Sequence, residues 1–145
     1  MLYYPAFRNL FYYRIKQSSV ILACLLKPLL PEMNTLFVYA ERIGPGLYIQ
    51  HGFSTIITAK SIGEDCWINQ QVTIGYNRGG EQAPVIGDRV TITAGAKIIG
   101  DCNIGDGSII GANAVVVKNV PPGCTVVGVP GRIIRRDGVR VDEAL

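Results

Sequence analysis

The chain has 145 residues, of which 48% are hydrophobic and 17% are charged, and its formal net charge is +3. This length favours a single domain, and the mean hydropathy of +0.27 indicates much buried surface, part of which an oligomer would supply. The charge is mild, and aromatic and basic residues do not alternate, which argues against a partner made of nucleic acid. The four cysteines have neither metal-binding nor disulfide spacing. We therefore expect a cytoplasmic protein with no metal, in which Cys66 and Cys102 are inert core thiols.

The first part of the chain, residues 1–35, has a helical character. Pro5 can begin a helix, and apolar residues recur at helical spacing over the next ten positions. A second helix is expected from about Ser18 to Leu26. We interpret residues 1–35 as a helical cap over one end of the domain that follows. The alternative is peripheral contact with a membrane through these helices, whose basic residues would face anionic headgroups.

An isoleucine then recurs every six residues, with a glycine after most of them and a small or β-branched residue four positions later. A period this short suits one strand and one corner, repeated as a solenoid. Because strand residues alternate sides, the isoleucine and the small residue should point inward, while the glycine should relieve the corner by taking a positive φ. Three such hexads would form one coil, with about four to five coils from Ile43 to Val127, because 18 residues complete a turn. The series comprises Ile62, Ile68, Ile74, Ile86, Ile92, Ile98, Ile104 and Ile110, and Val116 continues it.

The repeat is disturbed at three places. One extra residue near Thr55 should shift the inward phase to Ile56. Residues 76–84 are polar and rich in turn formers, so we expect a loop that projects from the solenoid. After residue 131 a basic tail, residues 132–145, should follow a last strand.

This pattern resembles the left-handed parallel β-helix of the hexapeptide-repeat acyltransferases, over residues 36–136. It resembles the serine acetyltransferases in particular stretches, at residues 72–75, 94–100, 110–116 and 128–130. The resemblance implies a mainly β fold with a β-helical domain over residues 36–131. It also implies acetyl-CoA as the acyl donor and a homotrimer with active sites between subunits.

His51 is the only histidine of the chain, and its neighbours Gly52 and Ser54 are small enough to leave room for a ligand. It aligns with the catalytic histidine of the serine acetyltransferases. Imidazole exchanges protons near neutral pH, so His51 is predicted to take the proton of an acceptor hydroxyl and pass it to the departing thiolate of CoA. The aspartate that orients this histidine in the family is missing, and a backbone carbonyl, Glu41 or Glu81 would have to replace it.

The resemblance places CoA in the groove between two solenoids. Small side chains there would let the pantetheine arm lie close, and basic side chains would meet the phosphates. The alternative for the basic residues is a solvated C-terminal face. The expected CoA-binding residues are Tyr76, Ala94, Gly95, Ala112, Lys118, Arg132 and Arg135.

The expected acceptor-binding residues are Gln50, Glu81 and Gln82. Gln50 stands where the family has an aspartate, and Gln82 and Ala83 stand where it has an Arg-His pair that holds the serine carboxylate. A zwitterionic amino acid needs charged partners at both ends. The sequence therefore favours a neutral acceptor, a sugar of a surface or capsular polysaccharide or its precursor. A serine O-acetyltransferase and a non-catalytic oligomeric scaffold remain as alternatives.

Overall fold

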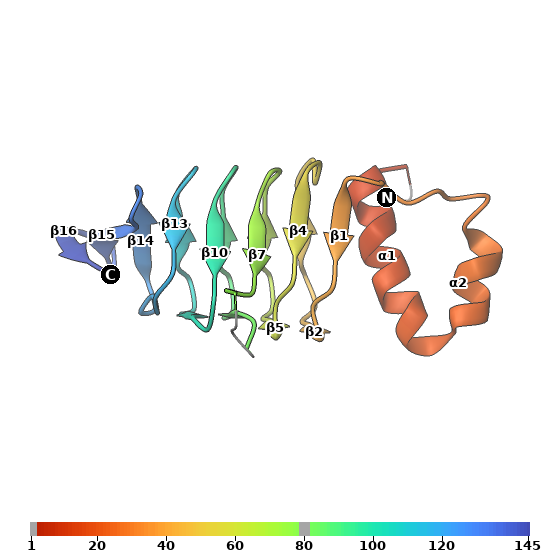
Figure 1. Cartoon of the computed structure of the whole chain (residues 1–145), viewed down its shortest axis with the longest axis horizontal. Coiled ribbons are helices and arrows are strands. Elements are labelled where there is room, and N and C mark those ends of the chain that lie inside the picture. The colour runs from red at the N-terminus through yellow and green to blue at the C-terminus, as the bar shows by residue number, and fades with distance from the viewer. Residues whose placement is uncertain (1–2, 79–81) are drawn as a thin grey trace.

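The computed structural model describes residues 3–78 and 82–145. Two helices at one end are followed by a stack of short strands that wind around a common axis (Figure 1). Glu81, one of the expected acceptor-binding residues, lies outside the described residues.

The stacked strands form a prism with three faces, each of them one sheet. The first face consists of β1 (Leu36–Val38), β4 (Thr55–Ile57), β7 (Thr73–Gly75), β10 (Lys97–Ile99) and β13 (Val115–Val116). The second face consists of β2 (Arg42–Ile43), β5 (Ser61–Ile62), β8 (Val85–Ile86) and β11 (Asn103–Ile104). The third face begins with β3 (Tyr48–Ile49), β6 (Trp67–Ile68), β9 (Thr91–Ile92) and β12 (Ile109–Ile110), and ends with β14 (Cys124–Val127), β15 (Arg132–Arg136) and β16 (Val139–Ala144). Five strands in the first face mean about five coils, so the predicted β-helix is confirmed.

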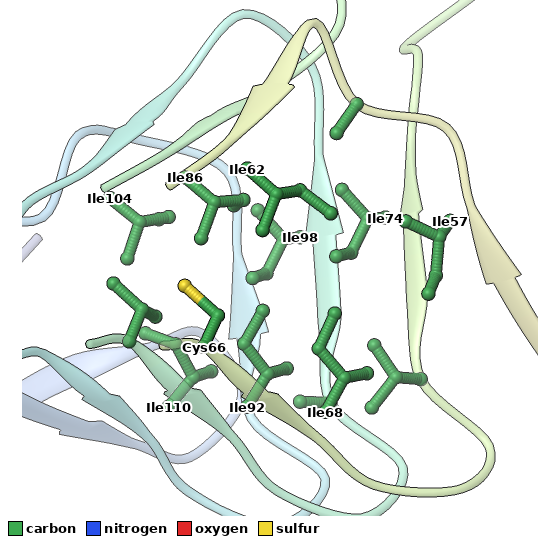
Figure 2. Packing of buried hydrophobic residues seen from close by; sticks show 14 of the residues in the cluster. Ile57, Ile62, Cys66, Ile68, Ile74, Ile86, Ile92, Ile98, Ile104 and Ile110 are labelled. Carbon is green, nitrogen blue, oxygen red and sulfur yellow. The ribbon is translucent and has the colours of Figure 1, made fainter. Parts of the chain in front are cut away.

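The interior is a set of isoleucine ladders, as the six-residue period predicts. Parallel pairing brings Ile62 beside Ile86 and Ile68 beside Ile92, so that like residues of successive coils stack. Figure 2 shows these ladders running side by side through the interior of the prism. Most of the isoleucines have no exposed surface. Burying such a side chain contributes about 1.5–3 kcal/mol, so the ladder is the main source of stability.

The predicted phase near Thr55 is wrong by one residue. Thr55 and Ile57 are fully buried, whereas Ile56 is 42% exposed. Ile57 pairs with Ile74 of the next coil and therefore occupies the inward position. The corner before β4 is longer than a standard corner and the corner after it is shorter. The sequence spacing alone shows only the sum of the two changes.

The role predicted for the glycines that follow the isoleucines is also wrong. None of them has a positive φ. A Cβ atom on Gly63 would instead lie 2.6 Å from the backbone of Gly87, and one on Gly44 would lie 2.7 Å from the backbone of Gly63, because successive backbones approach closely there. In most corners a positive φ occurs three residues after the inward residue, for example at Asp65 and Asn113.

The predicted helical cap is confirmed. α1 (Pro5–Ser18) lies against β1 and β3, and α2 (Val20–Leu26) packs on α1. The Asn9 amide donates to the carbonyl oxygens of Met33 and Leu36 at 2.9 and 2.8 Å and accepts from the Met33 N–H. Arg14 donates to the carbonyls of the first coil, at Ile43 and at the next residue. These bonds satisfy polar groups that an open end would leave unpaired.

The opposite end differs from the expected tail. Residues 132–144 form a hairpin of β15 and β16, which pairs antiparallel with β14 at the end of the third face. Two exposed ion pairs, Arg132–Asp142 and Arg136–Glu143, tie the hairpin together. The basic residues thus form part of a sheet that extends the solenoid.

Candidate functional site

The corners that lead from the third face to the first face stack into one edge of the prism, which we call the His51 edge. It comprises residues 50–54, 69–72, 93–96 and 111–114. Backbone hydrogen bonds join these corners: Gln71 N donates to Phe53 O at 3.0 Å, and Asn113 N donates to Ala94 O at 2.9 Å. The edge is therefore a continuous strip of backbone along the axis.

His51 lies on this edge and is exposed to solvent. Its φ of 64° is unusual for a residue other than glycine. The buried Gly52 makes the turn possible, since a Cβ atom there would lie 3.0 Å from the side chain of Ala6 and 3.1 Å from that of Leu36. The corner thus holds the backbone against the cap and directs the imidazole away from the core.

None of the groups considered for orienting His51 bonds to it within the described residues. Glu41 lies at a corner between the first and second faces, where its N–H bonds to Ala59 O at 3.1 Å. The imidazole makes no hydrogen bond in the part of the chain that the structure describes. Both ring nitrogens are therefore available to a substrate or to a neighbouring subunit.

Gln50, beside His51, has a partner that sequence reasoning missed. The Trp67 indole N–H donates to Gln50 Oε1 at 3.2 Å. The Tyr48 ring meets the Trp67 ring edge to face, with centroids 4.8 Å apart. Both aromatic side chains are 44% exposed. Their positions immediately before the inward Ile49 and Ile68 would have indicated this outward-facing pair.

Three of the predicted CoA-binding residues lie on the His51 edge. Ala94 and Gly95 are two coils from His51, and Ala112 is three coils away. Since neighbouring strands are about 4.8 Å apart, these residues are about 10 and 15 Å along the edge. Arg132 follows at the end of the same edge, where it pairs with Val127, and its guanidinium binds Asp142 Oδ1 at 2.7 and 2.9 Å.

The other predicted residues lie elsewhere on the same chain. Tyr76, Gln82 and Lys118 belong to the corners between the first and second faces, and the Lys118 ammonium donates to the backbone oxygen of Leu145 at 2.6 Å. Arg135 pairs with Thr125 in the hairpin sheet. A single protomer therefore divides the predicted site between two edges of the prism.

The buried cysteine thiols offer no second reaction centre. Cys66 and Cys102 are buried in the core, as predicted. Burial raises the pKa of the Cys102 thiol to about 11, which keeps it protonated and weakly nucleophilic. Among the described residues, no cluster of three or more histidine, cysteine or acidic side chains could hold a metal ion.

Comparison with known proteins agrees with this fold. The family model of the bacterial transferase hexapeptide (six repeats) matches residues 83–118. The serine acetyltransferase of Synechococcus elongatus is 38% identical over 98% of this chain and 62% of the relative. The chain thus spans about three fifths of that protein.

Two solved structures are similar as well. The Neisseria gonorrhoeae serine acetyltransferase in complex with serine has a TM-score of 0.73 and 35% identity, over 90% of this chain and 57% of the other. A serine acetyltransferase in complex with CoA has a TM-score of 0.62 and 32% identity, over 85% of this chain and 52% of the other. The chain folds as a β-solenoid, and its residues 83–118 match the hexapeptide-repeat family model. Within that class it is similar to the serine acetyltransferases, as its sequence motifs predict.

Proposed function

We propose that the chain is an O-acetyltransferase that transfers the acetyl group of acetyl-CoA to a small hydroxyl acceptor, with L-serine as the first candidate. The observation that carries this proposal is the exposed His51 on an edge that also bears Ala94, Gly95 and Ala112. The His51 edge thus combines a proton acceptor with a strip of small residues along which the pantetheine arm of CoA could lie.

His51 acts as the general base. A neutral alcohol is a poor nucleophile, and removal of its proton during attack typically accelerates such a step by about 10²–10⁴-fold. The acceptor oxygen forms a bond to the thioester carbon, and the carbon–sulfur bond then breaks. His51 returns the proton to the departing thiolate, so the chain needs no nucleophile of its own. This role is consistent with the burial of Cys66, Cys102 and Cys124 in the core.

A second copy of the chain completes the site in this proposal. CoA would run along the His51 edge from His51 toward Arg132, and the first-to-second-face edge of a neighbouring subunit would supply Tyr76, Gln82 and Lys118. The separation of the two edges within one protomer favours a shared site. A homotrimer meets this requirement because its three-fold axis repeats one edge-to-edge contact. Acetyl-CoA as donor implies a cytoplasmic enzyme.

The acceptor is the point at which sequence reasoning and the comparisons diverge. The neutral Gln50 and Gln82 favoured a sugar, whereas the named relatives are serine acetyltransferases. The relatives outweigh the composition argument, because a neighbouring subunit can supply charges that one protomer lacks. A sugar stays as the second candidate on one observation: the exposed Tyr48–Trp67 pair and the Gln50 amide make a neutral, aromatic surface beside His51.

Release of CoA from acetyl-CoA, measured with L-serine and with a panel of neutral sugars, tests the proposal. We expect turnover that depends on L-serine. Turnover with sugars but not with serine would select the second candidate. Absence of acceptor-dependent release with every compound, by a folded trimer, would contradict the enzyme and favour a scaffold.

A further inference from the structure

The end of the molecule opposite the hairpin exposes an apolar surface that the proposed reaction does not use. α2 projects beyond α1 (Figure 1), and Ala23 is its one buried residue. We call the exposed apolar side chains here the apolar tip. They are Val20, Ile21, Leu22, Leu25 and Leu29, with exposed fractions between 45% and 77%. A cluster of this kind on a soluble protein marks an interaction surface.

The charge around the apolar tip is strongly one-sided. Residues 1–35 hold four basic residues and one acidic residue, Glu32, and therefore carry a charge equal to the chain's whole net charge of +3. Lys16, in the last turn of α1, and Lys27, at the C-terminal end of α2, share the Glu32 carboxylate at 3.3 and 3.1 Å, which leaves an excess positive charge there. Arg14 bonds to neutral carbonyl groups only, so its charge is not compensated.

This charge distinguishes between the partners that would cover the apolar tip. A second copy docked end to end would bring two caps of charge +3 together, and they would repel. An anionic lipid surface attracts the same cap, and its acyl region accepts apolar side chains. Among the described residues, no helix is long and apolar enough to cross a bilayer, so the contact would be peripheral.

We propose that the apolar tip and its flanking lysines form a docking surface for an anionic lipid membrane. The tip inserts its apolar side chains among the lipid headgroups, and Lys16 and Lys27 contact the lipid phosphates. In a three-fold trimer the three tips face the same way, because rotation about the axis keeps equivalent ends at one level. Three weak contacts then act together on one surface.

Flotation of the full chain with lipid vesicles tests the proposal. Vesicles of phosphatidylcholine alone are compared with vesicles that also contain phosphatidylglycerol, at low and high salt. We expect binding to the anionic vesicles, weakened by salt because screening shortens the reach of the lysine charges. The double variant I21E/L25E should bind about tenfold more weakly or not at all, and Lys27→Glu should also weaken binding.

The matched control is the double variant V129E/V139E, which adds the same two charges at exposed apolar residues of the opposite end, and it should bind as the parent does. Circular dichroism would verify that each variant keeps the β-helix. Failure of the parent to float with anionic vesicles would overturn the proposal, as would equal binding by I21E/L25E and V129E/V139E. Light scattering would also overturn the proposal if the assembly formed by I21E/L25E had half the mass of the parent assembly. In that case a second copy of the chain would cover the tip in the parent.

Discussion

At the scale of single residues, glycines at the same place in the repeat have different tasks. Gly63 and Gly75 both follow an inward isoleucine. A Cβ atom on Gly63 would meet the backbone of Gly87 at 2.6 Å, whereas one on Gly75 would have nothing within 4 Å. The close approach of successive coils, rather than the backbone conformation of the corner, therefore explains the need for glycine at Gly63.

Gly63→Ala should lower the free energy of unfolding by about 1–3 kcal/mol, because the backbone of the next coil must move. Gly75→Ala is the matched control and should be nearly neutral. Chemical denaturation of the two variants compares them directly. Equal effects would show that crowding between coils is not the reason for the glycine.

The thiols give a second residue-scale prediction. Cys24 is exposed and the other three cysteines are buried, so one thiol per native chain should react rapidly with a thiol reagent, and four should react in denaturant. Burial raises the pKa of Cys102 to about 11 from 9.0, so the folded state retains a proton that the unfolded state loses. This contribution to stability is present below about pH 9 and is lost as the pH rises toward 11. Denaturation midpoints that rise over that range would contradict the assignment.

At the scale of elements, the hexad predicts strands and corners well where it is regular. It predicts the inward side of Ile68, Ile86 and Ile92 because alternation within a strand leaves no other choice. It fails at β4, because the longer corner before this strand and the shorter corner after it appear in the sequence as a single inserted residue. It also misses the hairpin of β15 and β16, whose pairing depends on contacts with β14 that no local repeat encodes.

The corrected phase of β4 is testable with neighbouring residues. Ile57→Ala should cost about 2–5 kcal/mol in the free energy of unfolding, since it leaves a cavity between coils. Ile56→Ala removes a partly exposed side chain and should cost less than about 1 kcal/mol. Thermal or chemical denaturation of both variants distinguishes the two phases. A larger loss for Ile56→Ala would restore the phase expected from sequence.

At the scale of the whole molecule, the winding of the chain brings site residues together. His51, Ala94 and Ala112 are far apart in sequence and share one edge because each lies in the corner after a third-face strand. The sequence motifs identified these residues through family resemblance. They did not reveal that Tyr76 and Lys118 belong to another edge, because that division follows from three-dimensional winding.

If acetyl-CoA lies along the His51 edge, a large side chain introduced on this edge should weaken its binding. Ala94→Phe should raise the KM for acetyl-CoA on the order of tenfold to a hundredfold while the KM for the acceptor changes little, since the ring would displace the cofactor arm. Glu64→Phe, two residues after an inward isoleucine on another edge, is the matched control. Steady-state kinetics of both variants would identify the edge that the donor uses. An unchanged KM in Ala94→Phe would exclude this path for CoA.

The central claim is that His51 carries the proton of the transfer. The most direct measurement is the rate of serine-dependent CoA release by His51→Asn, because asparagine tolerates the positive φ at this corner and preserves the fold. The account predicts a loss of about 10²–10⁴-fold, with an intact oligomer, while Asp65→Asn, at another exposed corner of positive φ, keeps the parent rate. A His51→Asn variant that releases CoA as fast as the parent would contradict the account.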